Sequence, residues 1–257
     1  MAKVFLGVGH GGKDPGAVAN GFKESQFNLD VAKSCAEELK RHGVVVKLSR
    51  ETDASENLAQ RIKECKAFKP DLAGDIHFNA GGGDGAEVYH KKTDKTDDEL
   101  AKNILAELEK IGQNSRGMKT KTYNGDDYFG FVREMDCPSV LVECAFIDNK
   151  ADIKIADTLA KRKKMGEAIA KGFLKTLKIA YKPKNDFLTT KGYLHKGDSG
   201  KSVEKLCDFF ANNVKGDYFG DYLEACVKVF QKQNGLTQDG KFTETVLKKL
   251  AEKGFKY

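Results

Sequence analysis

The chain begins with a short apolar run that ends at a histidine set among glycines, and this stretch constrains the fold more than any other. Residues 4–8 predict a short buried strand, and three glycines and a proline within residues 11–16 exclude an immediate helix. His10 therefore lies at the end of a strand, where glycines allow backbone to approach closely.

The same stretch overlaps two phosphate-binding patterns. Its glycine spacing matches a dinucleotide-binding fingerprint, and Gly7-x-x-x-x-Gly12-Lys13 is most of a phosphate-binding loop. That loop requires a Ser or Thr hydroxyl after its lysine to hold magnesium, whereas Asp14 places a negative charge there. We therefore interpret His10 either as a residue of a solvated turn or as a metal ligand that needs partners.

Length and charge limit the possible classes of protein. The 257 residues are enough for a sizeable core and for two domains, and no apolar run is long enough for a transmembrane segment. The apolar run before His10 is too short for a secretory signal, so we expect synthesis in the cytoplasm without a signal peptide. The net charge of +6 is spread along the chain, which argues against a nucleic-acid surface and is compatible with modest attraction to an anionic polymer such as a cell wall.

The cysteines form no C-x-x-C pair, so the sequence predicts neither a zinc knuckle nor a redox motif. Most of them lie on apolar faces of expected elements, which is typical of buried free thiols in a reducing compartment. The six cysteines are Cys35, Cys65, Cys137, Cys144, Cys207 and Cys226. Nothing in the sequence indicates an oligomeric state.

Strand and helix patterns alternate up to about residue 180, which predicts an α/β domain with a largely parallel sheet flanked by helices. After the first strand, we expect strands at 44–48, 71–78, 86–90, 128–132 and 140–142. The first expected helix begins at Glu24, and the second follows Ser55. A third follows a capping box at Thr96–Glu99, and the last includes Met165 to Leu177.

The remainder of the chain differs in kind. Three short helical patterns follow without a strand signal between them, which predicts a small all-α three-helix domain. We therefore expect an α/β domain at 1–179, a lysine- and proline-bearing linker at 180–191, and a helical domain at 192–257.

Four polar side chains follow strands or begin a helix on what should be one edge of the sheet. His10 ends the first strand, Glu24 starts the next helix, His77 ends the third strand, and Glu143 follows a later one. Ligands of open α/β sheets gather beyond the carboxyl ends of the strands, so these groups should converge. Two imidazoles and one carboxylate form the ligand set of a catalytic zinc site, with one position left for water.

The other three histidines are weaker candidates. His42 lies at the C-terminal end of a helix, where a cation suits the helix dipole. His90 leads into a charged run at 91–95, and His195 belongs to the second domain. None of them is followed by a glycine loop like the one beside His10.

The motifs around the four groups resemble those of the zinc-dependent N-acetylmuramoyl-L-alanine amidases of the type 3 family over residues 3–178. They are Gly9-His10-Gly11-Gly12-x-Asp14-x-Gly16-Ala17, Glu24, Ile76-His77-x-Asn79-Ala80, Arg116-Gly117 and Leu141-x-Glu143-x-x-Phe146-x-x-Asn149. The chain departs from the family in having Gly7-Val8 for a common Asp-Pro, Asp75 for a Ser, and Cys144-Ala145 for a Leu-Gly.

The resemblance implies one Zn²⁺ bound by His10, Glu24 and His77, with Glu143 as the catalytic carboxylate. Glu143 would take a proton from the attacking water and pass it to the L-alanine nitrogen. Each histidine should have a partner that fixes its tautomer, and Asp75 is a candidate for His77. Asn79 could orient His77 or contact the substrate.

The C-terminal part resembles the three-helix peptidoglycan-binding domain, through Leu194-x-x-Gly197-Asp198-x-Gly200 and Phe230-Gln231-x-x-Asn234-Gly235-Leu236-x-x-Asp239-Gly240. Cys207 replaces the family's usual Gln, which is a departure at the expected ligand groove, and a spacer or pairing role stays open as the alternative. An amidase joined to a wall-binding domain is the layout of phage endolysins and of some autolysins, which are made in the bacterial cytoplasm and act on the cell wall after release.

The resemblance thus implies hydrolysis of the bond between N-acetylmuramic acid and L-alanine in peptidoglycan. Two alternatives stay open. One is a wall-binding protein with a vestigial metal site, and the other is a zinc peptidase that cuts within the stem peptide.

Overall fold

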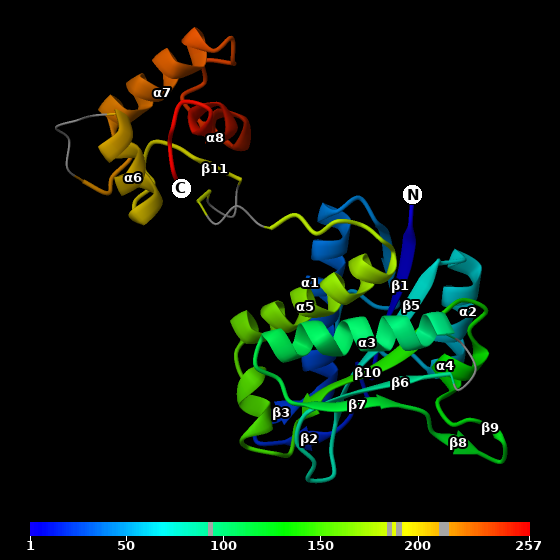
Figure 1. The fold of residues 1–257 in the computed structure, drawn as a ribbon. Helices are drawn as coiled ribbons and strands as arrows, with labels where there is room; N and C mark the ends of the chain where they lie inside the picture. Colours follow the sequence, from blue (N-terminus) through cyan, green and yellow to red (C-terminus); the bar gives the residue numbers. More distant parts are fainter. Residues whose placement is uncertain (92–94, 184–186, 189–191, 211–215) are drawn as a thin grey trace. The chain divides into compact units, whose positions relative to one another are not determined.

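A computed structural model of the chain describes residues 1–91, 95–183, 187–188, 192–210 and 216–257 (Figure 1). The chain divides into two compact units, Met1–Lys182 and Pro183–Tyr257. Much of the expected linker at 180–191 lies outside the described residues. No helix among the described residues is long and apolar enough to cross a membrane.

The first unit is built on a six-stranded sheet in the order β4-β1-β5-β10-β6-β7. Strands β4, β1, β5 and β10 are parallel, β6 is antiparallel to β10, and β7 is parallel to β6. The predicted, largely parallel sheet is therefore confirmed. The strands are β1 Lys3–Val8, β4 Val45–Leu48, β5 Leu72–Asn79, β6 Ala86–His90, β7 Ser115–Lys119 and β10 Ser139–Phe146.

Helices cover both faces of this sheet (Figure 1). Helices α1 (Glu24–Arg41), α3 (Lys95–Lys110) and α5 (Leu159–Thr176) pack on one face, and α2 (Leu58–Phe68) and α4 (Gly130–Glu134) lie on the other. Strand β1 is buried on both sides, because side chains alternate along a strand: Leu6 enters the α1–α5 core, and Phe5 packs with Phe131 on the other face.

Several short elements complete this unit. They are β2 Val18–Ala19, β3 Phe22–Lys23, β8 Thr122–Tyr123, β9 Asp126–Asp127 and the 3₁₀ helix η1 Asp152–Ile155.

Three expectations differ from the structure. The strand predicted at 128–132 is wrong, because Phe131 and Val132 belong to α4, and two adjacent apolar residues suit a short buried helix as well as a strand. Strand β7 was not predicted, because its polar, largely exposed residues show no alternating pattern. Thr96 lies inside α3, which begins at Lys95, and so is not its N-cap.

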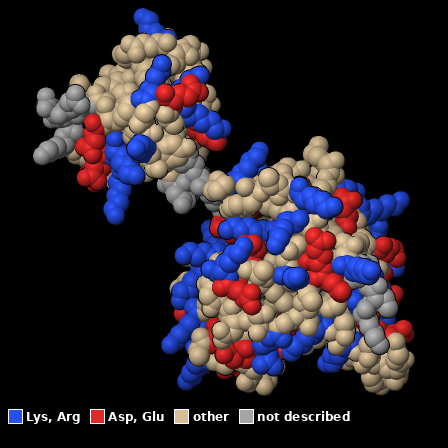
Figure 2. All heavy atoms as spheres, viewed as in Figure 1, with Lys and Arg blue, Asp and Glu red and all other residues tan. Residues whose placement is uncertain are grey.

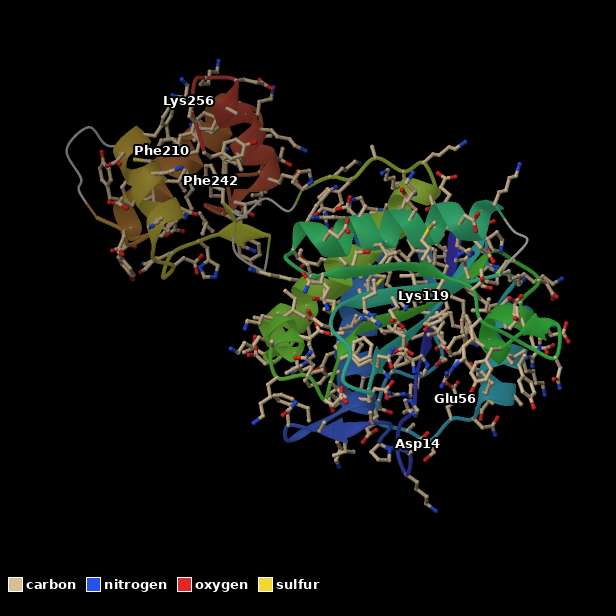
Figure 3. The ribbon with its side chains drawn as sticks, turned by 60° about the horizontal axis from the view of Figure 1, so that its bottom comes forward. Asp14, Glu56, Lys119, Phe210, Phe242 and Lys256 are labelled. Atoms are coloured by element: carbon tan, nitrogen blue, oxygen red, sulfur yellow. The ribbon has the colours of Figure 1, made fainter. Side chains whose placement is uncertain are left out.

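The second unit contains α6 (Lys201–Phe210), α7 (Asp221–Gln233) and α8 (Glu244–Ala251) around a separate apolar core. Phe242 is fully buried in that core and lies among the side chains of the unit in Figure 3. A short strand pair, β11 (Tyr193–Leu194) with β12 (Phe242–Thr243), supplements the three predicted helices.

All six cysteines are free thiols, and four of them are buried, as predicted from their positions on apolar faces. The surface carries Lys, Arg, Asp and Glu interspersed on the face shown in Figure 2, rather than one continuous basic face.

Helix α5 approaches α1 closely at Gly166, where an added Cβ would lie 2.4 Å from the carbonyl oxygen of Val31 and 2.8 Å from the nitrogen of Cys35. Gly166→Ala should therefore lower the free energy of unfolding by about 1–3 kcal/mol through overpacking. Helix propensity alone predicts that the same substitution raises the free energy of unfolding by about 1 kcal/mol, so the sign of the change separates the two effects. Urea denaturation measures it, with Lys164→Ala at an exposed position of α5 as the control; equal or greater stability of Gly166→Ala would contradict the close-packing argument.

Candidate active site

Three of the predicted site residues meet at the carboxyl edge of the sheet. His10 follows β1, Glu24 is the first residue of α1, and His77 lies near the end of β5. Glu24 connects the two histidines: its Oε2 lies 3.2 Å from His10 Nε2, and its Oε1 lies 3.0 Å from His77 Nδ1. One ligand atom from each residue lies within 4.8 Å of the others, so the three can hold one metal ion.

Backbone geometry near the end of β1 positions the two imidazoles. His10 has a φ of 59°, in the left-handed region, and a two-residue turn links Gly11 to Asp14. Gly9 lies directly under His77, because an added Cβ would be 2.3 Å from His77 Cε1. Only glycine therefore leaves room for the His77 ring over β1.

Glu24 is buried and oriented by hydrogen bonds from the backbone. The backbone N–H of Ala17 donates to Oε2 at 2.9 Å, and the backbone N–H of Phe78 donates to Oε1 at 3.2 Å. Burial favours the neutral acid, but hydrogen bonds with His10 and His77 hold the pKa of Glu24 well below its usual range. Glu24 is therefore an ionised carboxylate, as a metal ligand must be.

Each histidine has a second carboxylate on its other nitrogen. Asp14 Oδ2 lies 2.8 Å from His10 Nδ1, and Asp75 Oδ2 lies 3.4 Å from His77 Nε2. Burial lowers the pKa of His77, but Asp75 and Glu24 outweigh it and raise the pKa to about 10. Asp75 was predicted as a candidate partner of His77, but Asp14 was not predicted as the partner of His10. A spacing of four residues across a glycine turn does not show that the two side chains meet.

Glu143 lies beside this group. It is on β10, in register with His77 on β5, and its side chain is half-buried. Its Oε2 is buried and has no hydrogen-bond partner among the residues that the structure describes. Burial, with help from Glu24 and Glu87, raises the pKa of Glu143 to about 7, although His77 opposes that shift. A carboxyl group with this pKa can accept or donate a proton near neutral pH.

Asn79 makes its side-chain contacts elsewhere. Its Nδ2 donates to Glu87 Oε2 at 3.2 Å, and its Oδ1 accepts from the backbone N–H of Ala80 at 2.8 Å. No hydrogen bond between the side chains of Asn79 and His77 is observed among the described residues. The expected role in orienting His77 therefore has no support in these contacts.

Sequence reasoning also missed a charged cluster on the neighbouring strands. Glu87 is opposite Glu143 in the β6–β10 pair and is almost fully buried. It accepts from Arg116 Nε at 2.6 Å, from Lys119 Nζ at 2.5 Å and from Tyr89 OH at 2.8 Å. Lys119 is labelled in Figure 3. The Arg116-Gly117 motif and the alternation within 86–90 were the available signals.

The remaining histidines have partners elsewhere in the structure. His42 Nδ1 lies 2.9 Å from the carbonyl oxygen of Glu38, His90 Nδ1 lies 2.8 Å from Asp98 Oδ1, and the backbone N–H of His195 donates to Asp198. None of the three belongs to the metal-binding group formed by the described residues.

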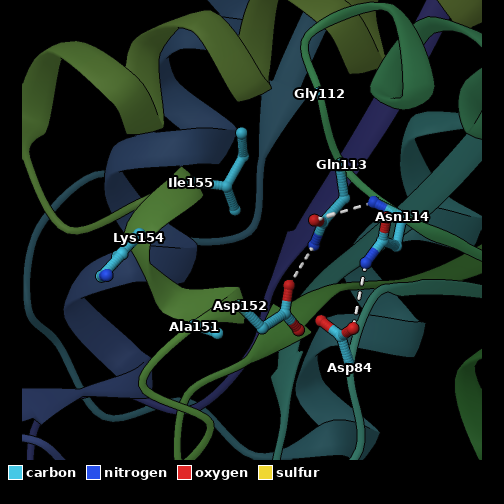
Figure 4. Close-up of a pocket in the computed structure, with 8 residues that line it drawn as sticks. All are labelled: Asp84, Gly112, Gln113, Asn114, Ala151, Asp152, Lys154 and Ile155. Carbon is cyan, nitrogen blue, oxygen red and sulfur yellow. Dashed lines mark hydrogen bonds between the residues drawn. The ribbon is translucent and has the colours of Figure 1, made fainter.

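A separate pocket, shown in Figure 4, is structural in character. Gln113 Nε2 donates to Asp152 Oδ1, and Asn114 Nδ2 donates to Asp84 Oδ2. The other oxygen of Asp152 accepts from the backbone N–H groups of Gly85 and Phe146. These polar groups hold the ends of β6, β7 and β10 together.

The chain matches two family models. The model described as N-acetylmuramoyl-L-alanine amidase matches residues 4–175, and that of a peptidoglycan binding domain matches residues 204–250. The amidase model thus covers most of the first unit, and the second model lies within the second unit.

Curated relatives include the N-acetylmuramoyl-L-alanine amidase LytC of Bacillus subtilis, 33% identical over 175 residues, which are 66% of this chain and 34% of LytC. The endolysin of Bacillus phage SPP1 is 33% identical over 188 residues, which are 70% of this chain and 67% of the endolysin. The match thus spans about a third of LytC and two thirds of the endolysin.

Among solved structures, the chain is similar to Cwp6 from Clostridium difficile, with a TM-score of 0.67 and 39% identity over 68% of this chain and 29% of that one. The catalytic domain of CwlV, an amidase from Bacillus (Paenibacillus) polymyxa, gives a TM-score of 0.64 and 26% identity over 70% of this chain and 100% of that one. Because the amidase model alone matches more than half of its length, the chain belongs to the N-acetylmuramoyl-L-alanine amidase family.

Proposed function

We propose that the chain hydrolyses the amide bond between N-acetylmuramic acid and L-alanine in peptidoglycan, with one zinc ion held by His10, Glu24 and His77. The observation that carries the proposal is the buried Oε2 of Glu143, which lies beside this three-residue group and has no hydrogen-bond partner in the described part of the chain. Related proteins named as amidases and as an endolysin support the same reaction.

The donor set fits zinc. Two imidazole nitrogens and one ionised carboxylate are the protein ligands typical of catalytic zinc sites, which leave one position open. Carboxylates on the outer nitrogens of both histidines are typical of metal-binding histidines, because they fix the tautomer and the ring orientation. Zinc bound there would acidify water and polarise the scissile carbonyl.

Glu143 would handle the protons of the reaction. An amide nitrogen is a poor leaving group until it is protonated, so a group that takes a proton from the attacking water can deliver it to that nitrogen. The raised pKa of Glu143 suits both steps, since the carboxylate must accept the proton and then release it. Breaking the bond leaves a free carboxylate on the lactyl group and a free amine on L-alanine.

The second unit would bring this chemistry to its polymeric substrate. Its match to a peptidoglycan binding domain supports wall binding, and the site of action would be the bacterial cell wall, as for an endolysin or autolysin.

Glu143→Gln should lower the rate of wall hydrolysis by about 10²–10⁴-fold, because it removes the proton-transfer group. Zinc content should stay at that of the parent, since Glu143 is outside the ligand group. The measurements are turbidity loss of purified walls and metal analysis of the same samples. Unchanged hydrolysis would reject the role of Glu143, and a parent protein without bound zinc or chelator-sensitive hydrolysis would favour a binding protein with a vestigial site.

Product analysis separates the amidase from a stem peptidase. Mass spectrometry of the parent's digest should find peptides with a free L-alanine amine together with intact glycan. Shortened stems still attached to muramic acid would instead identify a peptidase.

In protein from which a chelator has removed the metal, ionisation of Glu143 should lower the free energy of unfolding as the pH rises. The pKa of Glu143 is about 7 in the folded protein, against an ordinary value of 4.5, so folding favours the neutral carboxyl group. Its contribution to the free energy of unfolding is therefore present at low pH and is lost as the pH rises from 4.5 to about 7. Glu143→Gln is neutral throughout. Its stability relative to the parent should therefore increase from pH 4 to pH 8, by at most about 3 kcal/mol. Thermal melts at both pH values measure this change, with exposed Glu109→Gln as the control; a difference that does not grow with pH would contradict it.

Residues 1–182 should fold without the second unit, because the two units have separate cores. The truncated protein should keep the chemistry on small muropeptides but sediment less with purified walls than the full chain does. Equal sedimentation of both would argue for a spacer or pairing role of the second unit.

A further inference from the structure

Two side chains of β5 pack directly over two glycines of β1. Gly7 is in register with Asp75, and Gly9 lies under His77. An added Cβ at Gly7 would lie 2.3 Å from Asp75 Oδ1, just as one at Gly9 would lie 2.3 Å from His77 Cε1. The absence of side chains at both positions therefore lets the Asp75 carboxylate and the His77 ring lie over β1.

Asp75 is 1% exposed, and hydrogen bonds anchor its carboxylate. Arg61 Nη1 donates to both of its oxygens, at 3.0 and 3.2 Å. Arg61 is itself buried: its Nε donates to Glu56 Oε2 at 3.1 Å, and its Nη2 donates to the carbonyl oxygen of Val8 at 3.2 Å. This arrangement fixes Asp75 at the far side of His77 from Glu24.

We propose that Asp75 is a positioning residue that holds the Nε2 proton of His77, so that Nδ1 presents its lone pair to the metal beside Glu24, with Arg61 fixing Asp75. This inference rests on the proposed zinc site. An ionised carboxylate can only accept hydrogen bonds, so the imidazole nitrogen facing it carries the proton. The nitrogen 3.0 Å from Glu24 is then the one available as a ligand.

A purely structural role is the competing explanation. Asp75 would then serve only to balance the buried charge of Arg61. Glu56 offers the matched comparison, because it is the other carboxylate on Arg61 and no ion pair between Glu56 and His77 is observed among the described residues. The two carboxylates thus share one partner, but only Asp75 also touches the metal-binding histidine.

The test compares Asp75→Asn with Glu56→Gln. Zinc dissociation constants are measured by competition with a chromophoric chelator, at a temperature where circular dichroism shows each variant folded. Asp75→Asn should weaken zinc binding by about 10–100-fold, the range for loss of a carboxylate that supports a metal-binding histidine. Glu56→Gln should lower the melting temperature but leave zinc affinity near that of the parent.

A rescue variant uses the geometry of the two strands. Because the Cβ of a residue at position 7 would lie 2.3 Å from Asp75 Oδ1, Gly7→Asp combined with Asp75→Ser returns a carboxylate next to the space that the Asp75 carboxylate leaves. This double variant should bind zinc more tightly than Asp75→Ser alone. The proton NMR spectrum of the zinc-loaded parent should also show an exchange-protected Nε2 proton of His77, which Asp75→Ser should lose.

Equal zinc affinities of Asp75→Asn and Glu56→Gln would overturn the proposal and leave Asp75 as a charge partner of Arg61. If the double variant does not fold, the two single variants still decide. A parent that binds no zinc would instead refute the proposed function, before any variant is compared.

Discussion

The site depends on the pairing of β1 with β5, because this pairing fixes the positions of His10 and His77 relative to each other. The backbone N–H of Gly9 donates to the carbonyl oxygen of Ile76, so the chain leaves β1 for His10 directly beside His77. The rings then meet edge to face with centroids 5.2 Å apart. Parallel strands bring their carboxyl ends to one edge, and here that edge also receives the first turn of α1 with Glu24.

Charge is the second organising constraint. Ionised Glu24 lies between the two imidazoles, and their outer nitrogens face Asp14 and Asp75. Both oxygens of Glu24 and of Asp75 have hydrogen-bonding partners, as burial of charge requires, whereas Oε2 of Glu143 has none among the described residues. The one unsatisfied oxygen in this group therefore belongs to the residue whose pKa is raised toward neutrality.

The sequence predicted the parallel part of the sheet and the meeting of His10, Glu24 and His77, because buried strands and an amphipathic α1 carry strong periodic signals. It could not predict α4, where two apolar residues fit either kind of element, or β7, which is polar and at the sheet edge. Side-chain partnerships such as Asp14 with His10 depend on turn geometry and were equally out of reach. Gly7 and Asp75 look like two unrelated departures from the family pattern, but the register shows that they face each other on adjacent strands.

The cluster around Glu87 has a consequence for the backbone of the edge strand. Side chains three residues apart normally point to opposite faces of a strand, yet Arg116 and Lys119 both reach Glu87. The pairing of β6 with β7 shifts by one residue between Ala86–Ser115 and Val88–Met118, and Gly117, with a φ of 86°, lies within the shift. This β-bulge re-aims the strand, so the glycine that follows Arg116 lets two cations share one face.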